Sequence, residues 1–217
     1  MTRINRLIIQ ALLIVLAFGC STAKYSVTFK SQKKTMDTLI INKPYVLIIA
    51  DNMKTQMIDV DLTKSNEDLI KKNTIDLLSK KYFIKQLDYM KFDKDSLISL
   101  CNNLEKCNKT LNGFSIQSFL CQTKYTSGNQ FGLIILFYGG FNPNYETNYN
   151  LKTGIKTNTV YYDPMAKPYS DMVLMIIDFK KEQVVYFDRK NSSNFDPRLP
   201  DQIEQMTMNL LRPIYYK

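Results

Sequence analysis

The apolar residues of this chain recur at two different spacings, and the two spacings alternate along the sequence. Continuous apolar runs at 45–50 and 131–138 are typical of β-strands that are covered on both faces. Elsewhere apolar residues recur every three or four positions, which is the spacing of one face of a helix. A chain of 217 residues with this alternation predicts an α/β (α+β) fold, in which helices pack on a single mixed β-sheet of about five to six strands.

Helices are expected between the first strands and the central one. Ser65, with Asp68 three residues on, has the spacing of a capping box and predicts a helix that extends to about residue 80. A second helix is expected to begin at Asp93 or Asp95, because apolar residues then recur at helical spacing through residue 107. A third helix is expected at 115–125, and strands are expected at 38–41, 45–50 and 82–87.

The strongest strand signal, at 131–138, is followed by Gly139 and Gly140, which are expected to end that strand in a turn. Beyond them the sequence predicts a strand at 157–162, a late β-hairpin of 172–178 and 184–188, and a C-terminal helix between Pro200 and Pro213. No second core and no internal repeat is visible. Residues 38–217 are therefore predicted to form a single α/β domain.

The first twenty residues contain basic Arg3 and Arg6, an apolar run at 7–18 and then Gly19-Cys20. The run is shorter than the roughly 20 residues that a membrane-spanning helix needs. The pattern resembles a bacterial lipoprotein signal, which implies that 1–19 is removed and that Cys20 carries the lipid, palmitate included. The alternatives are a plain signal peptide or a buried hydrophobic hairpin. Ser21 resembles an outer-membrane address, and the lack of an acidic residue after Cys20 favours the periplasmic face.

The positive charge is concentrated near the N-terminus. The formal net charge is +9, and Arg3 and Arg6 of the signal contribute two of these charges. Residues 20–37 form a Lys-rich tether that holds four more charges, on Lys24, Lys30, Lys33 and Lys34. This distribution argues against a nucleic-acid partner, which requires a concentrated basic face. The tether either lies beside anionic lipid headgroups or is simply a solvated linker.

Several residue types that carry common enzyme chemistry are missing. The chain has no His and no Trp, and it contains neither a phosphate-binding GxxxxGK[ST] loop nor GxGxxG. Cys101, Cys107 and Cys121 form no CxxC pair, so a disulfide with one free thiol or three buried thiols are the alternatives, and Cys101 has the spacing of a core residue. Asp51, Asp59 and Asp61 are interpreted as solvated carboxylates in preference to a cation site. We expect no catalytic residue, cofactor or metal.

The order of the elements resembles that of periplasmic α/β lipoproteins related to the N-terminal domain of TolB and to the curli-secretion lipoprotein CsgG. The resemblance lies in the apolar strand at 133–138, which follows a helix, and in the late hairpin at 174–186 with its Asp178 turn. It covers roughly residues 38–212. The resemblance implies an accessory in envelope assembly or transport.

The segment 141–170 is rich in Asn, Tyr and Pro. Tyr supplies rigid contact area and Asn supplies adaptable hydrogen bonds, a mixture found in recognition surfaces. A long excursion without a binding role is the alternative. The candidate partner-binding residues are Asn144, Tyr145, Tyr149, Tyr161 and Tyr162.

Two functions are compatible with these observations. The first is a membrane-anchored periplasmic lipoprotein, held in the outer membrane through Cys20, that acts as a non-enzymatic accessory or scaffold and binds envelope partners or its own copies. The second is an envelope domain that binds a glycan or small ligand, with weak catalysis by Asp51 or Asp178 and tyrosines stacking on sugar rings. The absence of a catalytic motif favours the first.

Overall fold

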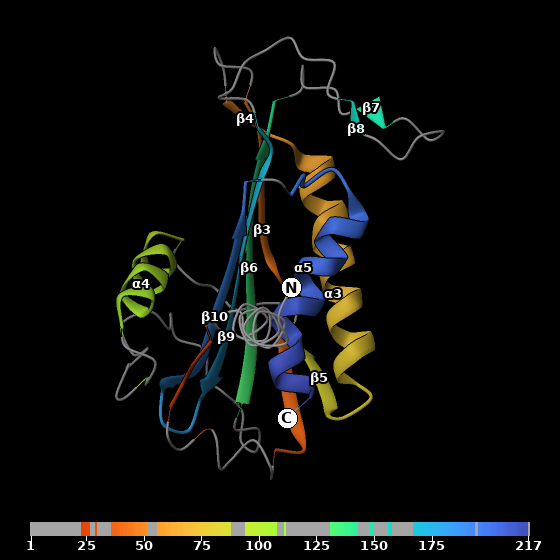
Figure 1. Ribbon diagram of the computed structural model, residues 1–217. Helices are drawn as coiled ribbons and strands as arrows, with labels where there is room; N and C mark the ends of the chain where they lie inside the picture. The colour runs from red at the N-terminus through yellow and green to blue at the C-terminus, as the bar shows by residue number, and fades with distance from the viewer. Residues whose placement is uncertain are drawn as a thin grey trace, which may run out of the picture.

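The computed structural model describes residues 23–26, 29, 36–51, 56–87, 94–107, 111, 131–142, 148–149, 156–157, 167–193 and 195–216. These residues form an eight-stranded mixed sheet and a separate two-stranded one. Helices α3 (Val60–Leu78) and α5 (Pro200–Tyr215) lie on one face of the large sheet, and α4 (Lys94–Lys106) lies on the other (Figure 1). The predicted fold class is confirmed, although the sheet has more strands than the five to six expected.

The large sheet is built on two long neighbouring strands, β6 and β9. Strand order is β1-β10-β9-β6-β2-β5, with β3 also paired to β6 and β4 paired to β3, while β7 and β8 form the small sheet. The strands are β1 (Lys24–Tyr25), β2 (Thr38–Asn42), β3 (Tyr45–Asp51), β4 (Gln56–Ile58), β5 (Phe83–Leu87), β6 (Phe131–Phe141), β7 (Asn148–Tyr149), β8 (Lys156–Thr157), β9 (Tyr169–Asp178) and β10 (Gln183–Ser192).

Strand β6 is paired along both of its edges, a position that suits a strand whose side chains are apolar on both faces. It runs antiparallel to β9 from Phe131 to Gly140. On its other side it pairs in parallel first with the end of β2 and then with β3. Pro44 separates β2 from β3, and a proline lacks the N–H that a continuous ladder would need. The two short strands thus together cover one edge of β6.

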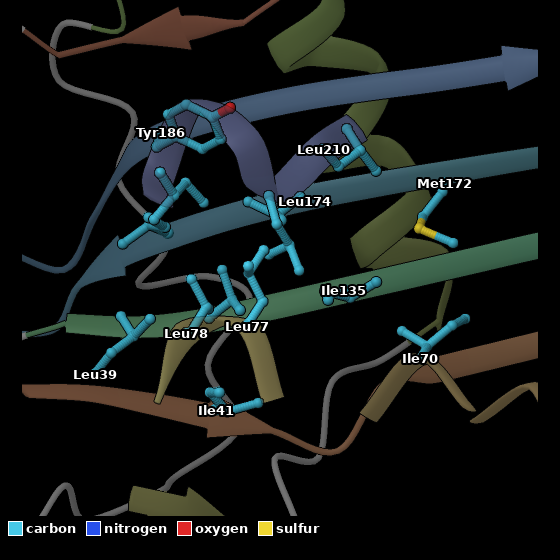
Figure 2. Close-up of a cluster of buried hydrophobic side chains, with 14 of the residues drawn as sticks. Leu39, Ile41, Ile70, Leu77, Leu78, Ile135, Met172, Leu174, Tyr186 and Leu210 are labelled. Atoms are coloured by element: carbon cyan, nitrogen blue, oxygen red, sulfur yellow. The ribbon is translucent and has the colours of Figure 1, made fainter. Parts of the chain in front are cut away.

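The larger core lies between the sheet and helices α3 and α5. Every second residue of the central strands points into it, as Ile135 of β6 and Leu174 of β9 do in Figure 2. Ile70 and Leu78 of α3 and Leu210 of α5 meet these strand residues and are fully buried. Burial of a Leu or Ile side chain contributes about 1.5–3 kcal/mol, so this layer supplies most of the hydrophobic stabilisation of the described fold.

Residues 23–26 and 29 contribute to the domain, although the sequence assigns 20–37 to a tether. Tyr25 of β1 pairs with Tyr186 of β10, and their rings meet edge to face with centroids 5.0 Å apart. The side chain of Phe29 is completely buried. A single Phe within a Lys-rich stretch has no periodicity that reveals this burial. The domain therefore includes part of the predicted tether.

The start of α3 differs from the prediction. The helix begins at Val60, five residues before the expected Ser65, and its N-cap is Asp59, whose side chain accepts a hydrogen bond from the N–H of Leu62. Asp is as good an N-cap as Ser, because its carboxylate satisfies one of the free N–H groups of the first turn. The second predicted helix is confirmed as α4, whereas the third, at 115–125, lies outside the described residues.

Gly139 and Gly140 do not end the central strand, contrary to the prediction. Strand β6 continues through both to Phe141. A Cβ atom on Gly139 would lie 2.9 Å from the Cβ of Pro197, and one on Gly140 would lie 2.4 Å from the ring of Tyr169. The glycines are needed because neighbouring groups pack directly against the strand backbone. Of the strand expected at 157–162, only Thr157 is described, at the end of β8.

The late hairpin and the C-terminal helix are confirmed. Asp178 ends β9, and its carboxylate accepts hydrogen bonds from the N–H groups of Lys180 and Lys181 at 3.0 and 3.2 Å. Asp178 and Asp188 are both buried. Helix α5 starts at Pro200 as expected, but it passes Pro213 and ends at Tyr215.

Candidate functional site

The sheet face opposite α3 and α5 is only partly covered by described residues. Side chains of residues paired across neighbouring strands project to the same side, so the strand register identifies the members of this face. We call the surface that they form the open face: Tyr45, Leu47 and Ile49 of β3, Leu136 and Tyr138 of β6, Tyr169, Asp171 and Val173 of β9, and Arg189 of β10.

Helix α4 covers the part of the sheet next to the open face. Its Leu100, Cys101 and Leu104 pack against a second apolar cluster that includes Met175. The C-terminal end of α4 is held by Lys24, whose Nζ donates hydrogen bonds to three backbone oxygens of 104–107. An ammonium group suits the negative end of a helix dipole. Strand β1 thereby fixes α4 at the edge of the open face.

An apolar hollow of about 410 Å³ lies on the open face. Such a volume falls within the roughly 300–1,000 Å³ of small-molecule sites. The side chains of Leu47, Ile49, Leu136 and Val173 provide apolar lining, and Cys101 with Asn102 line it from α4. Two further lining residues, Tyr45 and Tyr138, are 43% and 39% exposed, so the hollow is open to solvent between tyrosines. We call this space the apolar hollow.

A second, more open space adjoins the apolar hollow, and we call it the polar hollow. The two share Tyr138, Asp171 and Arg189 as lining residues. The other residues of the polar hollow are Tyr169, Ser170, Asn191, Ser192 and Ser193. The open face therefore passes from an apolar space to one rich in hydroxyl and amide groups.

Arg189 lies at the junction of the two hollows, and its guanidinium forms ion pairs with acidic neighbours. Its Nε lies 2.9 and 3.1 Å from the two carboxylate oxygens of Asp171, and its Nη1 donates to Glu105 of α4. The hydrogen bonds to Asp171 raise the pKa of Arg189, so the guanidinium stays charged. This arrangement ties β10 to β9 and α4.

Tyr138 and Tyr169 form the boundary of the polar hollow. Their ring centroids are 5.6 Å apart, and the rings are tilted by 42°. The ring of Tyr169 lies over Gly140, where any larger residue would displace it. Burial, followed by the neighbouring Tyr138 and Asp51, raises the pKa of Tyr169. The phenol therefore stays neutral and offers a hydrogen bond beside an aromatic surface.

The thiol at this site does not have the environment of an activated nucleophile. Cys101 is the only thiol that lines the apolar hollow within the described residues, and burial raises its pKa to about 12. The thiol is therefore uncharged near neutral pH, and the thiolate is the reactive form.

We predict that Cys101 resists alkylation in the folded protein. With a pKa of about 12, only about one thiol in ten thousand is ionised at pH 8. Iodoacetamide at pH 8, followed by peptide mass spectrometry, should modify the more exposed Cys107 at least about tenfold faster than Cys101. In urea the two rates should converge. Equal rates in the folded protein would show that Cys101 is not buried between α4 and the sheet.

Most site residues expected from the sequence lie outside the described residues. These are Cys20 and the candidate partner-binding residues Asn144, Tyr145, Tyr161 and Tyr162. Of Tyr149 only the backbone is described, in the two-stranded sheet where it pairs with Lys156. The prediction of a Tyr/Asn-rich binding segment therefore stays untested. Within the described part of the chain, Tyr138 and Tyr169, which are not among these candidates, meet on the open face.

The carboxylates suggested for weak catalysis do not converge. Asp51 ends β3 next to the end of β6, and Asp178 pairs with Phe131 at the beginning of β6. Strand β6 has 11 residues, so the two acids lie about 30 Å apart. A glycosidase pair needs a separation of about 5–10 Å. Asp51 and Asp178 therefore cannot form one acid–base site.

Asp51, Asp59 and Asp61 do not form a cation site either. Asp59 caps α3, and Asp51 accepts a hydrogen bond of 2.7 Å from Gln56. Among the described residues, no group of three or more Cys, Asp or Glu side chains is arranged to hold a metal ion. Asp59 is therefore not a solvated loop carboxylate, as the sequence suggested, but the N-cap of α3.

No family model matches the sequence, and no curated protein matches it. The PelC dodecamer from Paraburkholderia phytofirmans aligns over 83% of this chain and 88% of its own, at 9% identity and a TM-score of 0.35. A putative neuraminyllactose-binding hemagglutinin homolog from Helicobacter pylori aligns over 85% and 79%, at 11% identity and 0.36. Lipoprotein GNA1162 from Neisseria meningitidis aligns over 82% and 99%, at 11% identity and 0.31. TM-scores this low carry no argument about function.

Proposed function

We propose that this protein is a lipid-anchored periplasmic lipoprotein of the outer membrane that binds an apolar ligand on its open face without turnover. Its role is that of an accessory in envelope assembly or transport. The observation that supports this function best is the apolar hollow of about 410 Å³, which combines apolar lining with a polar junction at Asp171 and Arg189. Ligand sites have this composition in general.

The anchor is proposed from the N-terminal sequence. Cys20 follows the apolar run at 7–18 directly after Gly19, and Lys24 of β1 lies four residues further on. Within the described residues, no helix is long and apolar enough to cross a membrane. A lipid on Cys20 would attach the domain close to the edge formed by β1 and β10.

A second candidate function is docking of an envelope partner on the same face. It is favoured by the exposure of Tyr45, Tyr138 and Tyr169, which are 37–43% accessible. Aromatic side chains of this kind are enriched at protein interfaces. In this proposal the Tyr/Asn-rich segment at 141–170 also contacts the partner, and the partner can be a second copy of the chain.

The ligand-binding function is tested with the uncharged apolar dye N-phenyl-1-naphthylamine, which fluoresces when it leaves water. The full chain is kept in solution by an amphipathic polymer, because the alkyl chain of a detergent would compete. We expect saturable binding of one dye per chain. Leu47→Trp, which fills the hollow, should weaken binding at least about tenfold, equivalent to 1.4 kcal/mol.

The matched control is Phe83→Trp. Phe83 is 66% exposed on β5 and does not line either hollow. The natural chain has no Trp, so each variant carries a single Trp. The fluorescence of that Trp checks the folding of both variants in the same way. Absence of saturable binding in the native and Cys20→Ala chains alike, or equal loss of binding in Leu47→Trp and Phe83→Trp, would refute the proposed ligand site.

A further inference from the structure

We infer that the ligand of the open face is a single-chain amphiphile whose head group is uncharged or cationic. Its alkyl or acyl chain occupies the apolar hollow, and its head group occupies the adjoining polar hollow. This inference rests on the proposed function, in which the open face binds a ligand. It adds the chemical class of that ligand.

The apolar hollow has the size and lining for one chain. At about 30 Å³ for each heavy atom, 410 Å³ corresponds to about 14 atoms. Leu47, Ile49 and Leu136 line it with aliphatic groups, and Val173 extends this lining to β9. Each buried methylene contributes about 0.8 kcal/mol, so affinity is expected to increase with chain length until the hollow is full.

The polar hollow suits a head group that forms hydrogen bonds. It begins at Asp171 and Arg189, which also line the apolar hollow, so the two spaces adjoin at these side chains. Asn191, Ser192 and Ser193 provide amide and hydroxyl groups, and the aromatic pair of Tyr138 and Tyr169 forms another side. A ligand with one apolar end and one hydroxyl-rich or amine-bearing end matches this sequence of environments.

The charges at the junction select against an anionic head group. One guanidinium, that of Arg189, is bonded by two carboxylates, those of Asp171 and Glu105. Asp51 adds a negative charge near Tyr169, whose pKa it helps to raise. The ammonium group of Lys24 is directed to the end of α4, where three backbone oxygens accept its hydrogen bonds. The described surroundings of the head group are thus acidic, although the whole chain is formally +9.

Two sources could supply such an amphiphile. One is a free lipid of the membrane, and the other is the lipid proposed on Cys20. Lys24 pairs with Phe187, which lies two residues before Arg189 on β10. Cys20 precedes Lys24 by four residues, and four residues span at most about 14 Å, so a lipid on Cys20 is long enough to reach the hollows. Either source would place an acyl chain of the same chemistry in the apolar hollow.

The inference is tested by displacement of N-phenyl-1-naphthylamine from the full chain. Three competitors share a chain of about 14 carbons, which matches the hollow volume. They are monomyristoylglycerol, tetradecyltrimethylammonium and myristate, each used below the concentration at which it forms micelles. We expect the uncharged and the cationic competitor to displace the dye at concentrations at least about tenfold lower than myristate, a difference of 1.4 kcal/mol.

Glu105→Gln removes one of the two carboxylates on Arg189 and should reduce the preference over myristate several-fold. The matched control, Glu204→Gln, makes the same change on the exposed side of α5, beyond the opposite face of the sheet, and should leave the preference unchanged. Equal or tighter binding of myristate would overturn the inference. So would failure of all three competitors to displace a dye that does bind, a result that leaves the proposed function standing.

Native mass spectrometry distinguishes the two sources. A free lipid that adds its mass to the native chain, and is lost in Leu47→Trp, identifies a membrane lipid. If no free lipid is bound and Cys20→Ala binds the dye more tightly than the native chain, the lipid of Cys20 itself fills the hollow. Failure of the native and Cys20→Ala chains alike to bind any dye would contradict the proposed function rather than the ligand class alone.

Discussion

Phe29→Ala is expected to lower the free energy of unfolding by about 3–5 kcal/mol. The side chain of Phe29 is completely buried. Its ring lies 6.1 Å from that of Phe131 and 6.0 Å from that of Tyr186, centroid to centroid. Removing the ring leaves a cavity between β1, β6 and β10 and breaks the contacts of Phe29 with Phe131 and Tyr186. Urea unfolding followed by far-ultraviolet circular dichroism measures the change.

The control for this prediction is Phe83→Ala. Phe83 is 66% exposed, so the same loss of atoms should change stability by less than about 0.5 kcal/mol. If both variants unfold at the urea concentration of the native chain, Phe29 is not part of the core. Residues 20–37 would then be the solvated tether that their sequence indicates.

Cys20→Ala is expected to abolish fatty-acid labelling of the protein and to remove it from the lipid-anchored fraction. The physical reason is that attachment through acyl chains is the proposed source of membrane affinity, at about 0.8 kcal/mol for each buried methylene. Cells grown with an alkyne-bearing fatty acid report the modification after coupling to a fluorescent dye. The native chain should be labelled and Cys20→Ala should not.

Cys107→Ala is the matched control for labelling, because Cys107 is a free cysteine within the domain. It should retain the full label. A label that persists in Cys20→Ala would place the modification on another residue and contradict the proposed anchor. Loss of the label in both variants would point to a failure of export or folding, which immunoblotting of the periplasmic fraction detects.

The main elements of the fold could be predicted from the sequence because their apolar residues are periodic. The apolar runs at 131–138 and 172–178 are long enough to indicate strands, and both strands are confirmed as β6 and β9. Predictions from a few neighbouring residues failed at the start of α3 and at the glycine pair of β6. Asp59 begins α3 although Ser65 has the capping-box spacing, and Gly139 and Gly140 are required by Pro197 and Tyr169, which lie far away in the sequence.

The site was not predictable in the same way. Its residues come from β3, β6, β9, β10 and α4, so their proximity depends on strand order and register. Arg189 follows a buried strand segment and lies 18 residues from its partner Asp171, without any local motif. Tyr138 and Tyr169 appear in the sequence as ordinary strand residues. The alternation within β9 and β10 places Asp171 and Arg189 on one face, but only the antiparallel register, in which Arg189 lies opposite Val173 and Asn191 opposite Asp171, makes them diagonal neighbours.

The most direct test of the account is hydrogen–deuterium exchange of the full chain with and without N-phenyl-1-naphthylamine, measured by mass spectrometry of peptides. Binding on the open face predicts slower exchange in β3, at the 169–173 end of β9 and in α4, with no change in α3 and α5. The same protection should be missing in Leu47→Trp. Protection confined to α3 and α5, or no protection at saturating dye, would contradict a ligand site on the open face.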